Sequence, residues 1–136
     1  MKNNILNILK FLFYFSLIFL IILYLFPGSL LGYFLYGNLG KQPNIITNPL
    51  GTSLNHLIFF FYLSFLGLIL HNIQKKFINS FSFLFCISIF FELLHYFIPN
   101  RAFELNDLYA NSLGVLLAYL ILRLFKKLIN KNFLCG

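Results

Sequence analysis

Four long apolar runs, separated by one long connection and two short polar ones, constrain the fold more than any other feature of the sequence. They cover residues 5–26, 54–71, 77–98 and 107–125, and Phe, Leu and Ile dominate them. A helix needs about 20 mostly apolar residues to cross the hydrocarbon core of a bilayer. With 60% hydrophobic and 10% charged residues, the chain cannot cover a soluble domain with polar side chains. We therefore predict an all-α integral membrane protein, a small bundle of four transmembrane helices forming one domain over residues 1–136.

The basic residues flank the apolar runs instead of gathering on one helix face. An even number of spans puts both termini on the same side of the membrane. If that side is the cytoplasm, eight of the ten basic residues lie inside and only Lys41 and Arg101 lie outside. The positive-inside rule therefore predicts an N-in/C-in topology. This distribution is typical of membrane anchoring, so the net charge of +7 does not indicate a nucleic-acid partner.

The first run is longer than the apolar region of a secretory signal, which spans about 7–15 residues, and no small-residue cleavage motif follows it. We therefore predict a retained first helix that ends at Pro27 and Gly28. Residues 27–53 form a long outer loop rich in Gly, Pro and Asn, which favour turns. Its apolar beginning is expected at the membrane interface, because a re-entrant segment would expose irregular backbone to lipid.

Every acidic residue of the protein lies within residues 92–114. Glu92 falls inside the third apolar run, where an acid exposed to lipid costs on the order of 2.5–3.5 kcal/mol. Its carboxyl group is therefore expected to face the bundle interior and to be paired or protonated. Arg101 is the most obvious partner, and His56 and His95 are the alternatives.

The predicted topology brings polar groups from several helices to the outer side of the membrane. Together they predict an extracytoplasmic polar pocket with six ligand-binding residues. These are His56, Glu92, His95, Arg101, Asp107 and Asn111. On the fourth helix, Gly114 and Ala118 continue the face of Asp107 and Asn111. Small residues let transmembrane helices approach closely, so Gly114 and Ala118 are predicted to mediate helix packing.

Other interpretations of this cluster stay open. Glu92 and His95 form an E-x-x-H pair that could hold a metal together with His56 and Asp107, although this spacing often occurs by chance. The pair could instead serve a membrane-embedded enzyme or a proton or ion transporter, or the cluster could be purely structural. The sequence carries no nucleophile elbow, phosphate-binding loop or dinucleotide motif. We therefore predict no cofactor and no metal, lean against an enzyme, and assign no catalytic residue.

The polar positions are spaced in a pattern that resembles a known family. The pattern consists of Glu92, His95, Pro99, Arg101, Asp107, Asn111 and Gly114. It is similar to the signature of the VanZ-like membrane proteins, and His56 with the aromatic run after it is similar to the segment opening the family's second helix. The resemblance extends from about Thr52 to the end of the fourth helix. The family usually has Gln in place of His95, and an acid and a lysine in place of Thr52 and Ser53.

The resemblance implies a role in the bacterial cell envelope, because the founding member is linked to resistance to the glycopeptide antibiotic teicoplanin. We therefore expect a VanZ-like, multi-pass protein of the bacterial cytoplasmic (inner) membrane. Its partners are expected to be membrane lipids, a lipid-linked cell-wall precursor or an amphiphilic antibiotic. In this hypothesis Arg101 contacts an anionic group and is oriented by Glu92, while Asp107 and Asn111 fix the start of the fourth helix.

Overall fold

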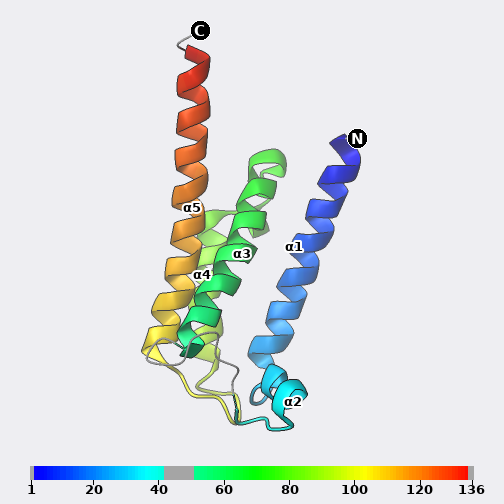
Figure 1. Cartoon of the computed structure of the whole chain (residues 1–136), viewed down its shortest axis with the longest axis vertical. Helices are drawn as coiled ribbons and strands as arrows, with labels where there is room; N and C mark the ends of the chain where they lie inside the picture. Colours follow the sequence, from blue (N-terminus) through cyan, green and yellow to red (C-terminus); the bar gives the residue numbers. More distant parts are fainter. Residues whose placement is uncertain (1, 42–50, 135–136) are drawn as a thin grey trace.

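The computed structural model describes residues 2–41 and 51–134, and all regular elements in these two ranges are helical. In chain order they are α1 (Lys2–Leu25), α2 (Leu30–Tyr36), α3 (Gly51–Gln74), the short 3-10 helix η1 (Phe77–Asn79), α4 (Phe81–Leu94) and α5 (Leu105–Leu134). Both termini lie at one end of the bundle (Figure 1). The other end, called the loop end here, carries α2 and the connection formed by residues 95–104 (Figure 1). The predicted all-α fold is confirmed for the described residues.

Three helices are long and apolar enough to cross a membrane. Their apolar segments are Asn3–Leu25, Ser53–Gln74 and Leu105–Leu128, which supports a multi-pass membrane protein. The fourth apolar helix, α4, has 14 residues. At 1.5 Å per residue it is about 21 Å long, shorter than the roughly 30 Å hydrocarbon core. The structure thus supports three of the four predicted spans by length, while the fourth span and the N-in/C-in orientation stay predictions.

The helix predicted over residues 77–98 is shortened at both ends. Ser80 caps α4 by accepting a hydrogen bond from the Phe83 N–H at 3.3 Å, and η1 occupies the preceding turn. At the other end, the N–H groups of residues 95–97 bond to carbonyls three residues earlier, which tightens the turn. Asn100 then adopts a left-handed φ of 59°. The apolar side chains continue through this turn, so their pattern hides the helix end.

The remaining boundaries also differ from the predicted ones. The second and fourth predicted helices are longer in the structure, as α3 and α5. The predicted outer loop contains α2, which begins where Ser29 Oγ accepts a hydrogen bond from the Gly32 N–H at 2.9 Å. It ends at Gly37, whose φ of 65° is the left-handed conformation common after helices. Residues 42–50 of that loop lie outside the described part of the chain.

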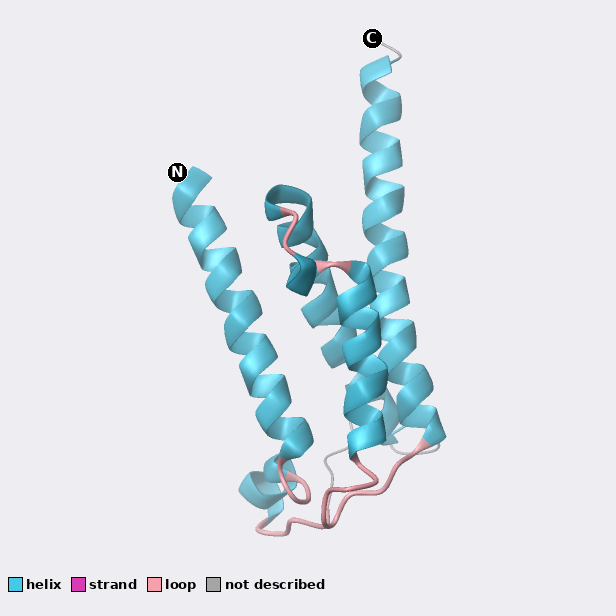
Figure 2. Ribbon diagram, turned by 180° about the vertical axis from the view of Figure 1, so that it is seen from behind, coloured by secondary structure: helices cyan, strands magenta, loops and turns pink. Residues whose placement is uncertain are grey.

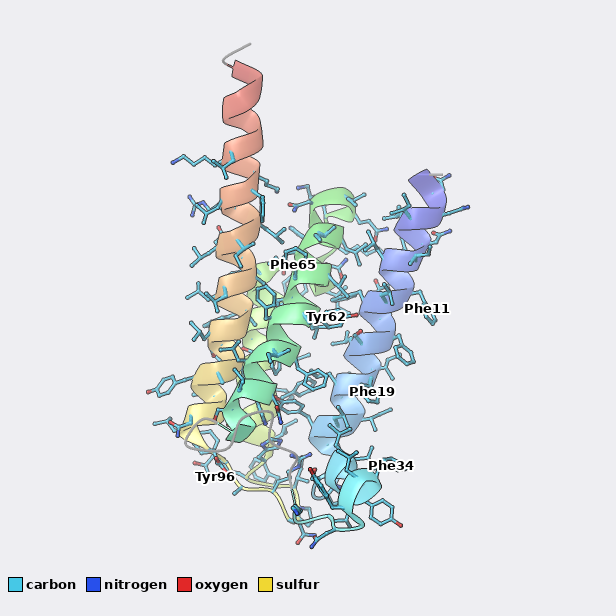
Figure 3. The ribbon with its side chains drawn as sticks, in the orientation of Figure 1. Phe11, Phe19, Phe34, Tyr62, Phe65 and Tyr96 are labelled. Atoms are coloured by element: carbon cyan, nitrogen blue, oxygen red, sulfur yellow. The ribbon has the colours of Figure 1, made fainter. Side chains whose placement is uncertain are left out.

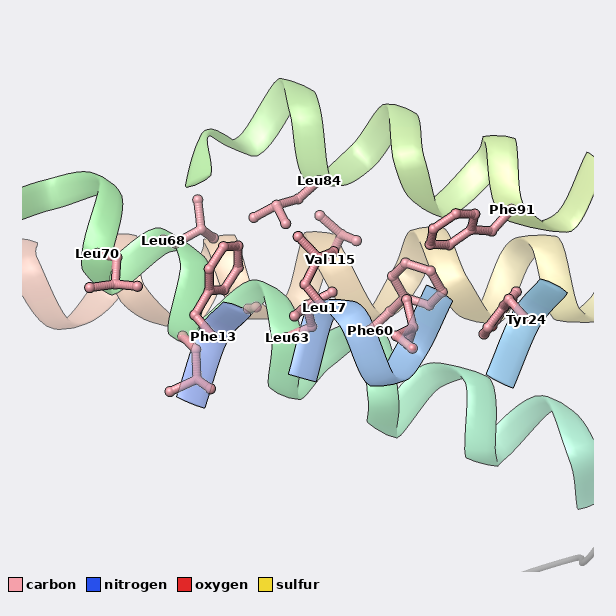
Figure 4. Close-up of a cluster of buried hydrophobic side chains, with 13 residues drawn as sticks. Phe13, Leu17, Tyr24, Phe60, Leu63, Leu68, Leu70, Leu84, Phe91 and Val115 are labelled. Carbon is pink, nitrogen blue, oxygen red and sulfur yellow. The ribbon is translucent and has the colours of Figure 1, made fainter. Parts of the chain in front are cut away.

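An apolar core fills the middle of the bundle and holds the four long elements together. Figure 4 shows this cluster, with Phe13 from α1, Leu63 from α3, Leu84 from α4 and Val115 from α5, all at most 1% exposed. Aromatic side chains also point away from the bundle, as Phe34 does in Figure 3 with 75% of its surface exposed. An apolar exterior around an apolar core fits a protein whose solvent is lipid.

Helices α3 and α5 make the closest contact in the bundle and run side by side from the loop end (Figures 1 and 2). A Cβ atom on Gly114 would lie 2.5 Å from the Leu57 carbonyl oxygen and 2.9 Å from the Phe61 nitrogen. Only glycine fits there without moving a helix backbone. Ala118 continues the same face of α5 and is fully buried. This contact holds the polar start of α5 against the polar start of α3.

Candidate ligand-binding site

Polar side chains from three helices and the 95–104 connection gather at the loop end, next to the apolar core. The predicted residues come from α3 (His56), α4 with the turn after it (Glu92, His95), the 95–104 connection (Arg101) and α5 (Asp107, Asn111). All of them are buried except Arg101, which is half-buried. Burying polar groups is costly unless they are hydrogen-bonded, so their partners determine what the cluster can do.

Glu92 is the centre of the cluster and is fully buried. Its Oε1 lies 3.2 Å from His95 Nδ1 and accepts a hydrogen bond from the Glu104 N–H at 3.3 Å. Its Oε2 accepts a hydrogen bond from Asn111 Nδ2 at 3.3 Å and lies 3.7 Å from His56 Nδ1. Both carboxyl oxygens of Glu92 therefore face hydrogen-bonding groups.

Arg101 is not the partner of Glu92, so that prediction is wrong. Its Nη2 donates to the Leu23 carbonyl at 2.6 Å and its Nε to the Phe26 carbonyl at 3.4 Å. Among the described residues it forms no ion pair with any carboxylate. The last carbonyls of a helix lack intrahelical partners and carry partial negative charge, so the end of α1 attracts the guanidinium. Glu92 is thus oriented by the two histidines and Asn111 instead.

Asp107 and Asn111 link α5 to neighbouring helices instead of pairing with each other. Asp107 Oδ1 accepts a hydrogen bond from Ser53 Oγ at 2.5 Å, and Oδ2 lies 3.5 Å from His56 Nε2. Asn111 Nδ2 also donates to the Ser88 carbonyl at 3.4 Å. These contacts connect α5 to α3 and α4, so the start of α5 is fixed by both neighbours.

Tyr24 on α1 belongs to the site, although sequence reasoning missed it. Its Oη donates to Asn111 Oδ1 at 2.9 Å and lies 2.7 Å from His56 Nδ1. Its ring stacks on the His95 ring with centroids 5.3 Å apart. A hydroxyl near the end of an apolar run was the available signal, but tyrosine there usually indicates the membrane interface. The other missed residues are Ser53, Ser88 and Glu104.

Two small cavities adjoin at this end of the bundle and share two residues, His56 and Arg101. The polar chamber has a volume of about 140 Å³ and a mostly polar lining. It is lined mainly by His56, His95, Asn100, Arg101, Glu104 and Asp107. The apolar chamber has a volume of about 70 Å³, and its mostly apolar wall includes Leu23, Leu30 and Phe59. The site therefore offers polar and apolar surface side by side.

Charged groups near the chamber shift one another's pKa values. Partial burial raises the pKa of the Glu104 carboxyl, and the nearby carboxylates of Asp107 and Glu92 raise it further. Burial lowers the pKa of Arg101 from its ordinary value, while Tyr24, Glu92 and Asp107 oppose that shift. Arginine stays protonated under such conditions, so its guanidinium keeps a positive charge at the chamber.

His95 places an unused ring nitrogen at the polar chamber. The ring is 3% exposed and lines the chamber, while its Nδ1 points to Glu92. Because Glu92 accepts hydrogen bonds, the ring proton of the neutral tautomer lies on Nδ1, which leaves the lone pair on Nε2. Nε2 is buried and has no hydrogen-bond partner among the described residues. It is therefore an acceptor available to a chamber ligand.

The polar cluster is confined to the loop end. It stops at Ser88 and Asn111, and the layer beyond contains Phe60, Leu63 and Val115, with Ser64 as a buried exception. A proton path needs a chain of polar groups or water across the membrane. The described side chains beyond this layer form no continuous chain of polar groups.

A family model described as VanZ/LLP1 matches residues 11–126. The match covers most of the chain and includes every residue of the polar cluster. No curated protein and no solved structure matches the chain. The family match confirms the resemblance seen in the sequence and names no ligand.

Proposed function

The chain belongs to the VanZ/LLP1 family, and we propose that it binds the phosphate-bearing head group of a membrane amphiphile at the loop end. The observation that carries this proposal is the pair of adjoining chambers that share His56 and Arg101, one polar and one mainly apolar. An amphiphile presents these two kinds of surface next to each other. Both chambers lie among helices that are apolar enough to stand in a bilayer.

The size of the polar chamber favours some of the expected partners over others. A water molecule occupies about 30 Å³ of liquid, so a chamber of about 140 Å³ has room for a phosphate group and a few neighbouring atoms. Pockets for drug-sized molecules are about 300–1,000 Å³. A phospholipid or a polyprenyl phosphate therefore fits better than a glycopeptide antibiotic or the sugar-peptide part of a precursor. Any effect on glycopeptide susceptibility would then act through the lipid.

Arg101 is the residue that we assign to the phosphate. The carbonyls of Leu23 and Phe26 hold its guanidinium at the boundary of the two chambers and use only part of its donors. A planar guanidinium fits phosphate oxygens with paired hydrogen bonds. The remaining donors are available to a head group from either chamber.

The proposal includes a location. The positive-inside rule favours termini in the cytoplasm, which would place the loop end on the outer face of a bacterial cytoplasmic membrane. There the protein would meet outer-leaflet lipids and lipid-linked cell-wall intermediates, and teicoplanin-type resistance is the expected phenotype. The rival is a scaffold in which the polar cluster only joins helices.

The test compares two lipids that differ only in phosphate. Full-length protein in detergent should bind a fluorescent phosphatidic acid more tightly than the matched diacylglycerol, and a polyprenyl phosphate arm separates a precursor carrier from a phospholipid. Arg101→Gln should weaken phosphatidic acid binding at least about tenfold, the value of one charge-assisted hydrogen bond. Arg123→Gln, at the exposed terminal half of α5, should leave it unchanged.

Two results would contradict the proposal. One is equal binding of both lipids by the wild type. The other is an unchanged affinity in a folded Arg101→Gln protein. In cells, the scaffold interpretation predicts that Arg101→Gln lowers membrane abundance and glycopeptide resistance together, whereas the binding proposal predicts lost resistance at normal abundance.

A further inference from the structure

We propose that the inner wall of the polar chamber holds a divalent metal ion of the zinc type, with His56, Glu92 and Asp107 as its protein ligands. The inference deepens the proposed function and rests on it for the metal's role, which is to offset negative charge where a phosphate enters. Metal binding itself needs no lipid. The sequence predicted no metal but left a site of Glu92, His95, His56 and Asp107 open as an alternative, and the structure groups three of these four residues without His95.

The three side chains already lie close to one another. One ligand atom from each of His56, Glu92 and Asp107 falls within 4.8 Å of the others. Histidine nitrogen and carboxylate oxygen bind zinc at about 2.0–2.2 Å, which puts two ligands of one ion roughly 3–4 Å apart. The 3.5 Å separation of His56 Nε2 and Asp107 Oδ2 is in this range.

The hydrogen bonds around His56 identify which of its ring nitrogens is available to the metal. Asn111 Nδ2 faces two acceptors, the Ser88 carbonyl and Glu92 Oε2. Turning the amide by 180° would place Asn111 Oδ1 against these two oxygens, so the orientation of the amide is fixed. Its Oδ1 therefore faces Tyr24 Oη and takes the single hydroxyl proton. Tyr24 Oη must in turn accept a proton from His56 Nδ1 at 2.7 Å.

This assignment leaves two acceptors facing each other. With its proton on Nδ1, neutral His56 turns the lone pair of Nε2 toward the carboxylate of Asp107 at 3.5 Å. Such a pair needs a cation or a proton between its members. Metal-bound histidines almost always donate their other ring N–H to an oxygen, and Tyr24 supplies that oxygen here.

Glu92 and Asp107 are both buried, and Arg101, the single Lys or Arg side chain of the described chain that lines the polar chamber, forms no ion pair with either of them. Buried carboxylates are usually paired or coordinate a metal, which favours a cation among these ligands.

His95 gives an independent indication of a ligand. Its buried Nε2 lines the chamber as an acceptor without a partner in the described chain. A water molecule on the metal would donate to it, and the chamber has room for such water. Glu92 orients His95 through Nδ1, so the same carboxylate would serve the ion and the water acceptor.

The experiment measures zinc uptake by the purified full-length protein in detergent. The protein is stripped with a chelator and titrated with Zn²⁺ alone, in competition with a chromophoric chelator. We expect one ion per chain, bound at least about tenfold more weakly after Glu92→Gln or Asp107→Asn. His71→Gln, a histidine variant in the last turn of α3 and outside the site, should stay close to wild type. Both carboxyl variants retain His71 and Cys86, so zinc held there would be unaffected.

Circular dichroism and gel filtration check that each variant is folded. X-ray absorption gives a second readout, the identity of the atoms around the bound metal. The metal should show only nitrogen and oxygen neighbours at about 2.0–2.2 Å. A sulfur neighbour, absence of zinc in the wild type, or undiminished binding in the folded carboxyl variants would overturn the proposal. Phosphatidic acid binding without zinc uptake would overturn the metal alone. Zinc uptake without phosphatidic acid binding would overturn the proposed function alone.

Discussion

Replacing Tyr24 with Phe removes one hydroxyl and leaves the ring in place. That hydroxyl is the bridge between α3 and α5, since it meets His56 Nδ1 at 2.7 Å and Asn111 Oδ1 at 2.9 Å. The ring packs against the rings of Phe60 and Phe91, and phenylalanine keeps those contacts. The substitution therefore isolates the polar bridge from the packing.

The expected loss of stability follows from the groups left behind. A buried donor or acceptor without a partner costs about 1–3 kcal/mol. His56 Nδ1 can turn toward Glu92 Oε2, now 3.7 Å away, and recover part of its loss. Asn111 Oδ1 loses its hydroxyl donor and stays buried. We therefore expect Tyr24→Phe to cost about 1–3 kcal/mol, above the average of about 0.6 kcal/mol for hydrogen bonds between membrane helices.

The assay is reversible unfolding in mixed detergent micelles, followed by circular dichroism. Tyr14→Phe is the matched control, because Tyr14 is on the same helix, packs against the core and makes no hydrogen bond within the described chain. It should change the unfolding free energy by less than about 0.5 kcal/mol. An equally small effect of Tyr24→Phe would refute the proton assignment of the cluster, and with it the argument for a free His56 Nε2.

Two further predictions test packing and topology. Gly114→Ala puts a Cβ atom 2.5 Å from a backbone oxygen of α3, so it should destabilise the protein by about 1–3 kcal/mol in the same unfolding assay. Gly40→Ala, whose Cβ would meet only a side-chain oxygen at 3.4 Å, should have little effect, and equal effects would refute the close contact. In a chain whose native cysteines are replaced by serine, Asn100→Cys should react with an impermeant maleimide on intact cells. Lys75→Cys should react only after permeabilisation, and the reverse pattern would contradict the N-in/C-in prediction.

The sequence predicted the apolar helices well and their ends poorly. Hydrophobicity is summed over many residues, so a run of Phe, Leu and Ile identifies a helix whatever its exact limits. The end of α4 at Leu94 depends on a backbone turn, and Tyr96, Phe97 and Ile98 continue the apolar pattern beyond it. The start of α2 was signalled by Ser29 and its end by Gly37, but each is a weak signal within a Gly-rich loop.

The sequence named six residues of the polar cluster, but its first choice of partner for Glu92 was wrong, and the alternatives His56 and His95 lie beside Glu92 instead. A polar residue in an apolar run must face the interior, and this reasoning needs no coordinates. Pairing by charge assigned Arg101 to Glu92, but Arg101 lies beside the end of α1, which only the folded chain reveals. Tyr24 was not predicted, because a tyrosine at the end of an apolar run is as typical of the membrane interface as of a buried hydrogen-bonding position.

The packing residues Gly114 and Ala118 lie on the same face of α5 as the site residues Asp107 and Asn111. On α5, Asn111 lies about one turn and Asp107 about two turns nearer the loop end than Gly114, and α3 runs in the same direction beside them. The backbone contact at Gly114 therefore sets the distance between the two helices where His56 meets Asp107. If Gly114 served only helix packing, a small shift of α5 would be tolerated. A metal site or a phosphate site would not tolerate it, because a displacement of 1 Å changes the 3.5 Å distance between His56 Nε2 and Asp107 Oδ2 by nearly a third. Ligand binding should thus be more sensitive to Gly114→Ala than the unfolding free energy is.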